Sequence, residues 1–565
     1  MTRTSRLAVS LAGLLLVASA SRASGQLSGT YTLDPNGSGP RNYPTWGAAV
    51  QALAAGVAGP VVFQVAPVTF RETVVLNGIP GASFTHTITF VAPGAPAILD
   101  ASGAPDTITL QSTAMHFVFR NLVVRGASSH ALNLNGVNPY TPAYCRFVDM
   151  TFIGPSTNTF PASAALISMA SHCDFVHCVF AGGHSAILCS VMTSNVFDRC
   201  EIDGLGAALM LVLPYTAHSY PQWAHDADNV WQNCFLHDCH PDGHAFYFDS
   251  QRYGGCGNMF WHNTIVVKTT RAAVQAGSRA AWTACQSWRN NIVVNLGTGP
   301  CVVYGYEITT SGMCLVCNDL DHNCYHAPSA TAGTVQLADG SFGGSLAQWK
   351  TWLQHNPQAI LPGGGSSYDN HSIEADPGLV RMTAPYDFHL RAGSPCLDRG
   401  TSTYVAGPWV TFNPTARVAS DFEGQDRPIG CAVDIGADEG DTLAGSGTGR
   451  IGSAVALHLD DAPAAGLPYA LGSSLGTGPI PIDTRRLGLA ADALLFLSVS
   501  GSCPAIFTGY RGVLDGQGKA QAAIGIPNLA GLIGVHLHSA FVTVDAAAPS
   551  GIRSISNPFS FQIAK

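Results

Sequence analysis

The sequence predicts an all-β chain: a right-handed parallel β-helix solenoid followed by a small antiparallel β-sandwich. Three observations predict it. A six-residue motif recurs at intervals of 22 to 34 residues, only 11% of residues are charged while 61 are glycine, and the pattern changes after residue 453 to alternating apolar and polar positions. Low charge with abundant Gly, Asn, Thr and Ser favours short strands and tight turns over helical bundles.

The motif opens with a bulky ring in seven of its eight copies. Successive copies start 28, 28, 22, 34, 29, 28 and 32 residues apart, which indicates a repeat with variable loops. If each repeat is one coil, equivalent positions stack about 4.8 Å apart. We therefore expect a ladder of buried rings at Phe119, Phe147, Phe175, Phe197, Trp231, Phe260 and Trp288.

The fourth position of the motif predicts a second ladder. It runs through Leu122, Met150, Cys178, Cys200 and Cys234, and then Asn263, Asn291 and Asn323. Asparagines in register can hydrogen-bond to one another and to turn carbonyls, which offsets the cost of burying an amide. A second strand follows each motif, as in Ala245-Phe-Tyr-Phe, and we expect a third in the variable region of each coil.

The ends of the chain predict its organisation. Residues 1–25 have the layout of a signal peptide, with Arg3, Arg6 and an apolar run from Leu7 to Ala18, so a secreted or cell-surface protein without a membrane span is expected. The β-helix is placed at 26–440, with a capping helix at Thr45 to Leu53. A linker at 441–453 precedes the sandwich at 454–565, in which Leu514-Asp-Gly-Gln-Gly predicts a hairpin.

Cysteine and charge limit the remaining possibilities. Most of the 16 cysteines lie in strand-like segments, where an inward thiol acts as a small apolar group, and a disulfide of Cys314 with Cys317 or Cys324 is the first choice if one forms. The Cys314 to Cys317 spacing alone is a weak zinc pattern. The net charge of -9 has no basic stripe, so a nucleic-acid partner is not expected, and the chain is expected to be a monomer.

One short segment gathers most of the candidate functional side chains. His237, Asp238, His240, Asp242 and His244 fall within eight residues, in a turn between two strands. The neighbouring coils place His184 and Asp203 before this turn, and Lys268 and Arg271 after it. Stacking of the coils would bring acids, imidazoles and two cations to one groove. His237, His240 and His244 could instead hold a transition metal.

The segment that closes the predicted solenoid resembles a known family. Ala375-Asp-Pro-Gly-Leu-Val, Asp387-Phe-His-Leu-Arg-Ala-Gly-Ser-Pro-Cys-Leu-Asp-Arg-Gly, Asp421-Phe-Glu-Gly-Gln-Asp-Arg-Pro and Asp434-Ile-Gly-Ala-Asp-Glu are similar to motifs of secreted right-handed parallel β-helix, pectin-lyase-like proteins. The opening Gly29-Thr-Tyr-Thr-Leu fits the same family, so the resemblance spans Gly29 to Gly440. It is specific for the fold and leaves the substrate open.

The resemblance implies a protein that binds or cleaves a polysaccharide. A polysaccharide lyase needs a cation or metal against the uronate carboxylate, a base for the C5 proton and an acid for the leaving oxygen. Lys268 or His244 could be the base, Arg271 the neutralising cation, and Asp238 with Asp242 a Ca²⁺ site. A hydrolase would instead use two carboxylates, which Asp203, Asp238 and Asp242 could supply.

Further polar residues could bind a sugar. His184, Asp203, His237 and His240 border the same turns, and Asp249, Arg252, Tyr253, Arg279 and Glu307 form a second polar edge after the next strand. Two alternatives stay open at this point. Histidine and aspartate in glycine-rich turns are often solvated turn formers, and the whole solenoid could be a non-catalytic adhesin or glycan-binding scaffold.

Overall fold

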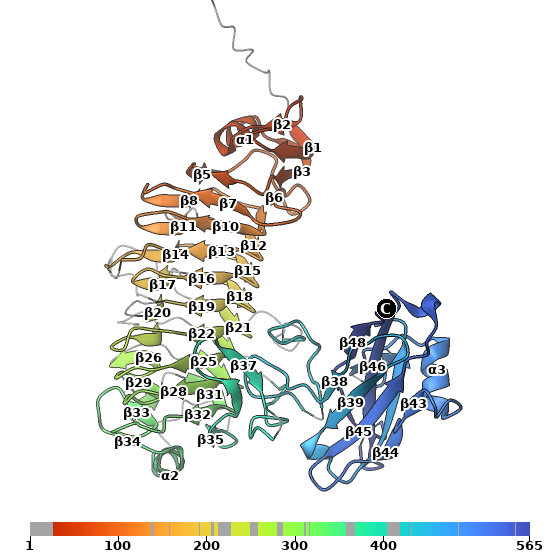
Figure 1. Cartoon of the computed structure of the whole chain (residues 1–565). Coiled ribbons are helices and arrows are strands. Elements are labelled where there is room, and N and C mark those ends of the chain that lie inside the picture. Colours follow the sequence, from red (N-terminus) through yellow and green to blue (C-terminus); the bar gives the residue numbers. More distant parts are fainter. Residues whose placement is uncertain are drawn as a thin grey trace, which may run out of the picture.

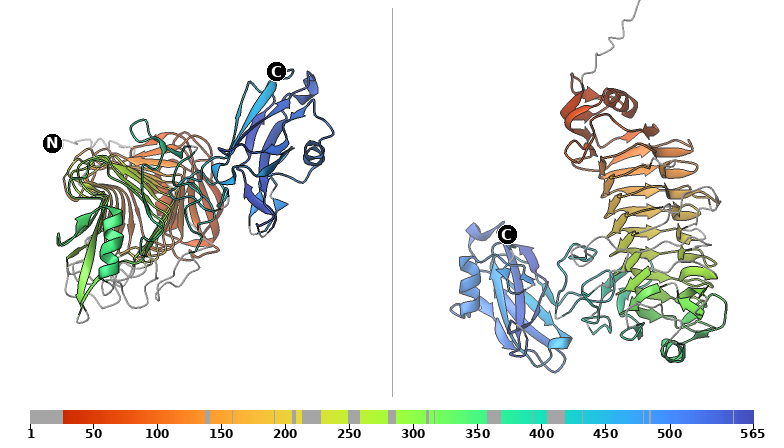
Figure 2. Two further views of the ribbon diagram at one scale, coloured as in Figure 1. Left: turned by 90° about the horizontal axis from the view of Figure 1, so that it is seen from below. Right: turned by 180° about the vertical axis from the view of Figure 1, so that it is seen from behind.

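A computed structural model describes residues 26–565 except 137–140, 158, 191, 205–207, 213–227, 249–257, 280–285, 310–311, 316, 357–367, 392, 404–417, 431, 479, 484 and 549. The expected signal peptide lies outside these residues. The chain forms a tall right-handed parallel β-helix with a separate sandwich beside its later coils (Figure 1). Three long sheets, named A, B and C here, run the length of the solenoid (Figure 2).

Each sheet takes one strand from nearly every coil. In sheet order, sheet A contains β2 (Asn42–Tyr43), β1 (Leu27–Leu33), β3 (Val57–Val65), β6 (Ile88–Val91), β9 (Phe117–Arg120), β12 (Arg146–Val148), β15 (Asp174–Val176), β18 (Val196–Asp198), β21 (Val230–Gln232), β24 (Met259–Trp261), β27 (Gln286–Arg289) and β31 (Cys317–Asp321). Sheet B contains β4 (Thr69–Phe70), β7 (Ala97–Asp100), β10 (Leu122–Arg125), β13 (Thr151–Ile153), β16 (Val179–Ala181), β19 (Glu201–Asp203), β22 (Phe235–His237), β25 (Thr264–Val267), β28 (Ile292–Asn295), β32 (Cys324–His326) and β35 (Ile373–Glu374).

Sheet C contains β5 (Val74–Leu76), β8 (Asp106–Gln111), β11 (His130–Asn135), β14 (Ser163–Ser168), β17 (Ser185–Ser190), β20 (Ala208–Val212), β23 (His244–Phe248), β26 (Val274–Arg279), β29 (Val302–Thr309), β33 (Val335–Leu337) and β34 (Gly343–Gly344), with β30 (Gly312–Leu315) paired to β29. All pairs are parallel apart from β29 with β30 and β33 with β34. Such stacking repeats one hydrogen-bonding pattern from coil to coil.

The predicted ring ladder is confirmed. From Phe119 to Trp288 the six neighbouring pairs of ring centroids are 5.4, 4.9, 4.7, 5.7, 4.5 and 4.3 Å apart, with planes within 10° of parallel. Phe63 and Phe90 extend the ladder toward the N-terminus. Every ring is buried, so each coil adds a large apolar contact to the same continuous core.

The asparagine ladder is also confirmed. The amide of Asn263 donates to the side-chain oxygen of Asn291, and that of Asn291 to Asn323, at 3.0 and 3.1 Å. The same oxygens accept backbone N–H groups of the preceding coil. The sequence interpretation missed a parallel ladder at the entry to sheet A, formed by Asn195, Asn229 and Asn258.

The third strand of each coil does not lie in the variable region, as expected, but within the six-residue motif. The six-residue motif is not one strand, because it bends at its third position and supplies strands to both sheet A and sheet B. The bend residues all have left-handed φ between 52° and 58°, and they are Asn121, Asp149, His177, Arg199, Asn233, His262, Asn290 and His322. Single residues other than glycine tolerate this conformation at modest cost when the stacked turns hold them in place.

Two helices cover the ends of the solenoid. The predicted N-terminal helix is α1 (Trp46–Leu53), capped by the Thr45 hydroxyl, which accepts from the N–H of Ala48. The opposite end carries α2 (Leu346–His355), which the sequence interpretation missed. Ser345 and Gln348 form a capping box there, and Leu346, Trp349 and Leu353 are buried. Both helices therefore shield coil ends that would otherwise be exposed.

The segment from residue 375 to 441, here called the strap, lies against the outer face of sheet B. Its strands β36 (Leu379–Arg381) and β37 (Asp387–Leu390) are antiparallel. Phe388 and Phe422 of the strap lie 4.9 and 3.9 Å from the ring of Phe235 on sheet B, between ring centroids. Arg427 pairs with Glu439 where the strap is buried. Sheet B is consequently covered over these coils.

The C-terminal region is the predicted sandwich. One sheet contains β38 (Leu443–Ser446), β39 (Ala454–Asp460), β45 (Lys519–Gly525) and β43 (Phe507–Thr508). The other contains β44 (Arg511–Val513), β40 (Pro468–Ser474), β46 (His536–Val544), β47 (Ile552–Ile555) and β48 (Phe559–Gln562). Outside these sheets lie α3 (Ala493–Ser500), two short 3-10 helices (Ala462–Ala464 and Ala530–Leu532) and the pair β41 (Ile480–Pro481) and β42 (Arg486–Leu487). The two sheets share one apolar core.

Three sequence expectations need correction. The expected linker 441–453 contains β38, which pairs with β39 and so belongs to the sandwich. The expected hairpin at Leu514 is a turn between β44 and β45, which lie in different sheets because β44 pairs with β40. Cys324 is a buried free thiol, so the alternative pairing with Cys314 is wrong, while the side chains of Cys314 and Cys317 lie outside the described residues.

Candidate functional site

The strand alternation of sheet C exposes one row of side chains across four coils. Tyr247, Gln275, Val303 and Gln336 are aligned in register on β23, β26, β29 and β33. Their neighbours Phe246, Val274 and Val302 point into the core. Since successive residues of a strand alternate between faces, this row faces outward. It forms the floor of an open hollow of about 420 Å³.

The wall of the hollow comes from the turns that lead into sheet C. His244 opens β23, Thr270 to Ala272 precede β26, and Thr298 to Pro300 precede β29. The stacking of these turns is very close. A Cβ atom on Gly299 would lie 1.8 Å from the carbonyl oxygen of Arg271, so only glycine fits there.

Buried polar residues fix the backbone of Arg271. The Asn295 amide donates to the Arg271 carbonyl at 2.9 Å, and the hydroxyl of Thr269 accepts from the Arg271 N–H at 3.1 Å. The carbonyl oxygens of Pro241 and Gly243, 2.9 and 2.6 Å away, share the single proton of that hydroxyl. Three consecutive turns are thereby tied together, and the exposed guanidinium of Arg271 starts from a fixed point at the edge of the hollow.

His244 is held as a neutral imidazole. It is 8% exposed, and its Nδ1 lies 2.8 Å from the carbonyl oxygen of Ala272. A carbonyl can only accept, so Nδ1 bears the proton and Nε2 has the free lone pair. Burial, with the charge of Arg271 in addition, lowers the pKa of His244 to about 4. At neutral pH this side chain is therefore unprotonated at Nε2.

His237, only seven residues earlier, lies on a different face in a different environment. It ends β22 on sheet B, is 4% exposed, and its Nε2 is 3.0 Å from Glu201 while its Nδ1 is 3.2 Å from Asp238. Burial lowers its pKa, but the hydrogen bond and charge of Glu201 outweigh that effect, and the pKa of His237 lies above its ordinary value. The ring of Tyr386 in the strap lies against that of His237, tilted by 36° with 4.5 Å between centroids, and its hydroxyl donates to Asp238.

The structure therefore divides the predicted cluster. His244 and Arg271 line the hollow on sheet C. Asp242 lies beside it and accepts from the Thr270 hydroxyl at 2.9 Å. His237 lies under the strap on sheet B, where Asp203 pairs with it in register, and the exposed Asp238 follows it. The three histidines proposed as metal ligands are thus not gathered on one face, since His237 and His244 lie on different sheets.

The remaining predicted residues lie outside the hollow or outside the described residues. Lys268 is exposed after β25 and does not line the hollow, and His240 is half-buried in the turn, where its Nδ1 accepts from the Asp242 N–H. His184 lies two coils earlier, with its ring against Phe160. Asp249 and Arg252 lie outside the described residues, as does Tyr253. The side chains of Arg279 and Glu307 are likewise not described.

A calcium site at Asp238 and Asp242 remains a prediction. Asp238 accepts from Tyr386 and Asp242 accepts from Thr270, on different sides of the turn. Among the described residues, two other groups bring three ligand atoms within 4.8 Å of one another: Asp321 with His322 and His371, and His389 with Glu423 and Asp438.

Comparison with known proteins gives only distant likenesses. No family model matches the sequence, and no curated protein matches it. Among solved structures, the mannuronan C-5 epimerase A-module of Azotobacter vinelandii is 10% identical over 53% of this chain and 81% of that one, with a TM-score of 0.29. An alginate lyase from a Paenibacillus species is 11% identical over 55% and 85%, with a TM-score of 0.25.

A third solved structure is a bacteriophage tailspike. It comes from an Acinetobacter baumannii phage, is described as a capsular polysaccharide depolymerase, and is 8% identical over 89% of this chain and 73% of that one, with a TM-score of 0.30. Scores of this size transfer neither a site nor an activity. The β-helix assignment therefore stands on the strand pairing itself, and the function has to be argued from the site.

Sequence reasoning missed the floor of the hollow and its support. Tyr247 belongs to the predicted second strand Ala245-Phe-Tyr-Phe, and the alternation of Tyr247 and Gln275 with the core residues Phe246 and Val274 is the signal that places them outside. Asn295 had no signal, because its role depends on which turns stack.

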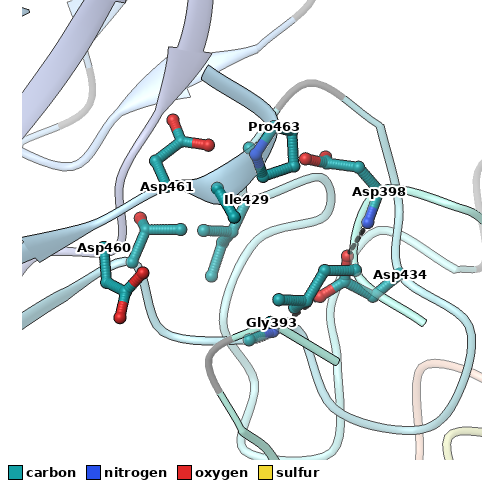
Figure 3. A pocket seen from close by; sticks show the side chains of 12 residues that line it. Gly393, Asp398, Ile429, Asp434, Asp460, Asp461 and Pro463 are labelled. Atoms are coloured by element: carbon teal, nitrogen blue, oxygen red, sulfur yellow. Dashed lines mark hydrogen bonds between the residues drawn. The ribbon is translucent and has the colours of Figure 1, made fainter. Parts of the chain in front are cut away.

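A further hollow lies between the strap and the sandwich and is lined by Asp398, Asp434, Asp460 and Asp461 (Figure 3). Its volume is about 10 Å³, which holds roughly one water and is too small for a sugar.

No helix among the described residues is long and apolar enough to cross a bilayer.

Proposed function

We propose that this chain is a secreted protein that binds an acidic polysaccharide along the open face of sheet C and cleaves it by β-elimination. The observation that supports this most strongly is the pairing of a neutral, buried imidazole with an exposed guanidinium in one hollow, at His244 and Arg271. A uronate lyase needs those two groups together: an unprotonated base for the C5 proton and a cation against the carboxylate.

The roles follow from the geometry. Arg271 binds the carboxylate of a uronate unit and so stabilises the negative charge that develops when the C5 proton leaves. His244 Nε2 accepts that proton, the C4–O bond breaks, and the imidazolium so formed gives the proton to the leaving sugar oxygen. A C4=C5 double bond remains, His244 is neutral again and no water is consumed. Tyr247, whose ring lies 5.1 Å from that of His244, faces the same hollow and can stack on a sugar ring.

Hydrolysis fits the hollow less well. A glycosidase needs two carboxyl groups flanking the bond. Among the described residues that line the hollow there is no Asp or Glu, and Asp242 at its edge is turned to Thr270. Elimination requires no such pair. A binding-only protein would use the same floor, so the distinction rests on product formation.

The experiment uses purified protein with polymannuronate, polyguluronate, polygalacturonate and glucuronate-containing glycans, with and without Ca²⁺. We expect ultraviolet absorbance from unsaturated ends and new reducing ends to rise together on at least one of them. New reducing ends without absorbance would mean hydrolysis and would contradict the proposal. Binding without either product would leave a glycan-binding scaffold.

A matched pair of variants locates the activity. Arg271→Ala removes the neutralising cation and should lower kcat/KM at least about 100-fold, because an electrostatic contact made in the transition state is lost. Lys268→Ala removes an equally exposed cation three residues away, outside the hollow, and should change the rate less than about twofold. Both side chains are exposed, so circular dichroism should show an unchanged fold. Equal losses in the two variants would move the site elsewhere.

A further inference from the structure

Three separate parts of the strap meet over sheet B with metal-binding side chains. His389 belongs to β37, Glu423 to the loop after Phe422, and Asp438 to the turn before the sandwich. One ligand atom from each lies within 4.8 Å of the other two. Nothing in the function proposed above uses these residues, which lie on the covered face of the solenoid.

The imidazole of His389 is oriented as a metal ligand would be. Its Nδ1 donates to Asp387 Oδ1 at 2.7 Å, so in the neutral ring Nε2 has the free lone pair. Nε2 lies 3.5 Å from Glu423 Oε1. That is long for a hydrogen bond but close to the roughly 3.4 Å that separates two ligands each about 2.1 Å from one tetrahedral ion. A carboxylate behind a metal-binding histidine is the usual way such a ring is fixed.

Asp438 has a buried oxygen with no donor. The residue is 2% exposed, and its Oδ2 accepts from the N–H of Leu390 at 2.9 Å. Its Oδ1 is fully enclosed and accepts no hydrogen bond within the described part of the chain. A buried carboxylate oxygen left in this way costs free energy, because water no longer solvates it. A cation beside Oδ1 would compensate that cost.

The surrounding charge also calls for a cation. Glu423 and Asp421 act electrostatically on Asp438, and Asp421 and Asp441 act on Glu423. His389 is the basic group that acts on Glu423 and Asp438, while Arg427 acts on Asp421. The other three-residue group differs in this respect. At Asp321, both oxygens already accept N–H groups of His371, and two imidazoles serve one carboxylate. Both carboxylate oxygens of that group therefore already have donors, although His322 Nδ1, 3.3 Å from Asp321 Oδ2, makes no hydrogen bond among the described residues.

We propose that His389 Nε2, Glu423 and Asp438 bind one divalent transition-metal ion, with Zn²⁺ the best match, and that this ion fastens β37 to the rest of the strap. An imidazole with two carboxylates suits Zn²⁺, whereas Ca²⁺ prefers six to eight oxygen ligands. Three protein ligands leave a fourth position for water. The ring of His389 is half exposed, so an ion can enter from solvent.

The test starts from chelator-treated full chain, to which ZnCl₂ or CaCl₂ is added before gel filtration, elemental analysis and thermal unfolding. We expect one zinc ion per chain, a higher Tm with zinc, and no comparable effect of calcium. Glu423→Gln keeps the size of a partly exposed side chain and should lose the ion and the Tm rise while its circular dichroism stays unchanged. Asp387→Asn, which disturbs only the orientation of His389, should weaken zinc binding about 10- to 100-fold.

The matched control is His371→Gln, which removes a histidine from the other group and should still bind one zinc ion. Wild-type protein without stoichiometric zinc would overturn the proposal, as would equal zinc content in wild type and Glu423→Gln. Loss of zinc in His371→Gln would place the ion elsewhere, and stoichiometric calcium in place of zinc would refute the choice of ion. None of these results depends on whether the chain cleaves a glycan.

Discussion

Two faces of the same coils show how far environment decides what a side chain can do. His237 and His244 are separated by one turn, and both are nearly buried. His237 lies under the strap among carboxylates that raise its pKa, while His244 lies at an open hollow where burial and Arg271 lower it. The covered face of sheet B serves stability and the open face of sheet C is available for chemistry. Sequence proximity alone would have given both histidines one role.

The largest expected difference between the faces is catalytic. His244→Gln keeps a group that can donate to the Ala272 carbonyl but removes the base, so kcat/KM should fall about 10²- to 10⁴-fold. His237→Gln should leave kcat/KM within a few-fold of wild type. Initial rates on a cleaved glycan check both. A large loss in His237→Gln alone would reverse the assignment of the two faces.

The next largest difference concerns stability. Phe235→Ala removes a ring packed on Phe388 and Phe422, and should cost about 3 kcal/mol and lower the Tm. Val303→Ala, a smaller truncation on the half-exposed open face, should cost less than about 1 kcal/mol. Hydrogen exchange across the strap should rise in the first variant only. Equal destabilisation in the two would mean that the strap does not secure sheet B.

The two histidines should also give opposite pH dependences of stability. For His244 the unfolded state binds a proton more readily, so its contribution is present above pH 6.5 and is lost as pH falls toward 4, by at most about 3 kcal/mol. For His237 the folded state binds the proton more readily, so its contribution is present below pH 6.5 and is lost as pH rises.

Thermal unfolding between pH 5 and 8 measures this difference. Relative to wild type, His244→Gln should gain Tm as the pH falls, and His237→Gln should lose it. The same trend in both variants would show that the two environments do not differ as described.

The fold was predictable because equivalent residues recur at the same position in successive coils. Phe119 to Trp288 and Asn263 to Asn323 occupy the same motif positions in consecutive coils, so each copy supports the others. The bend at the third motif position could not be predicted, because no glycine marks it. Asn, Asp, His and Arg adopt the left-handed conformation there. Stacked turns, which the local sequence does not reveal, hold those residues in place.

The site was only partly predictable. A dense turn predicted His244, and the next coil predicted Arg271. The division of that turn between two faces follows from strand alternation in three dimensions. The cover over His237 depends on Tyr386, 148 residues beyond Asp238, and the support of Arg271 depends on Asn295. Contacts of this range have no local pattern in one sequence.

The pH dependence of kcat/KM on a cleaved uronate glycan tests the central claim most directly, because it reports the base of the free enzyme. With His244 as that base, kcat/KM should be flat from neutral pH down to about 5 and should fall only as the pH approaches about 4, where the imidazole gains its proton. An inflection at or above pH 6.5 would show a base with an unperturbed or raised pKa, and would exclude His244 from that role.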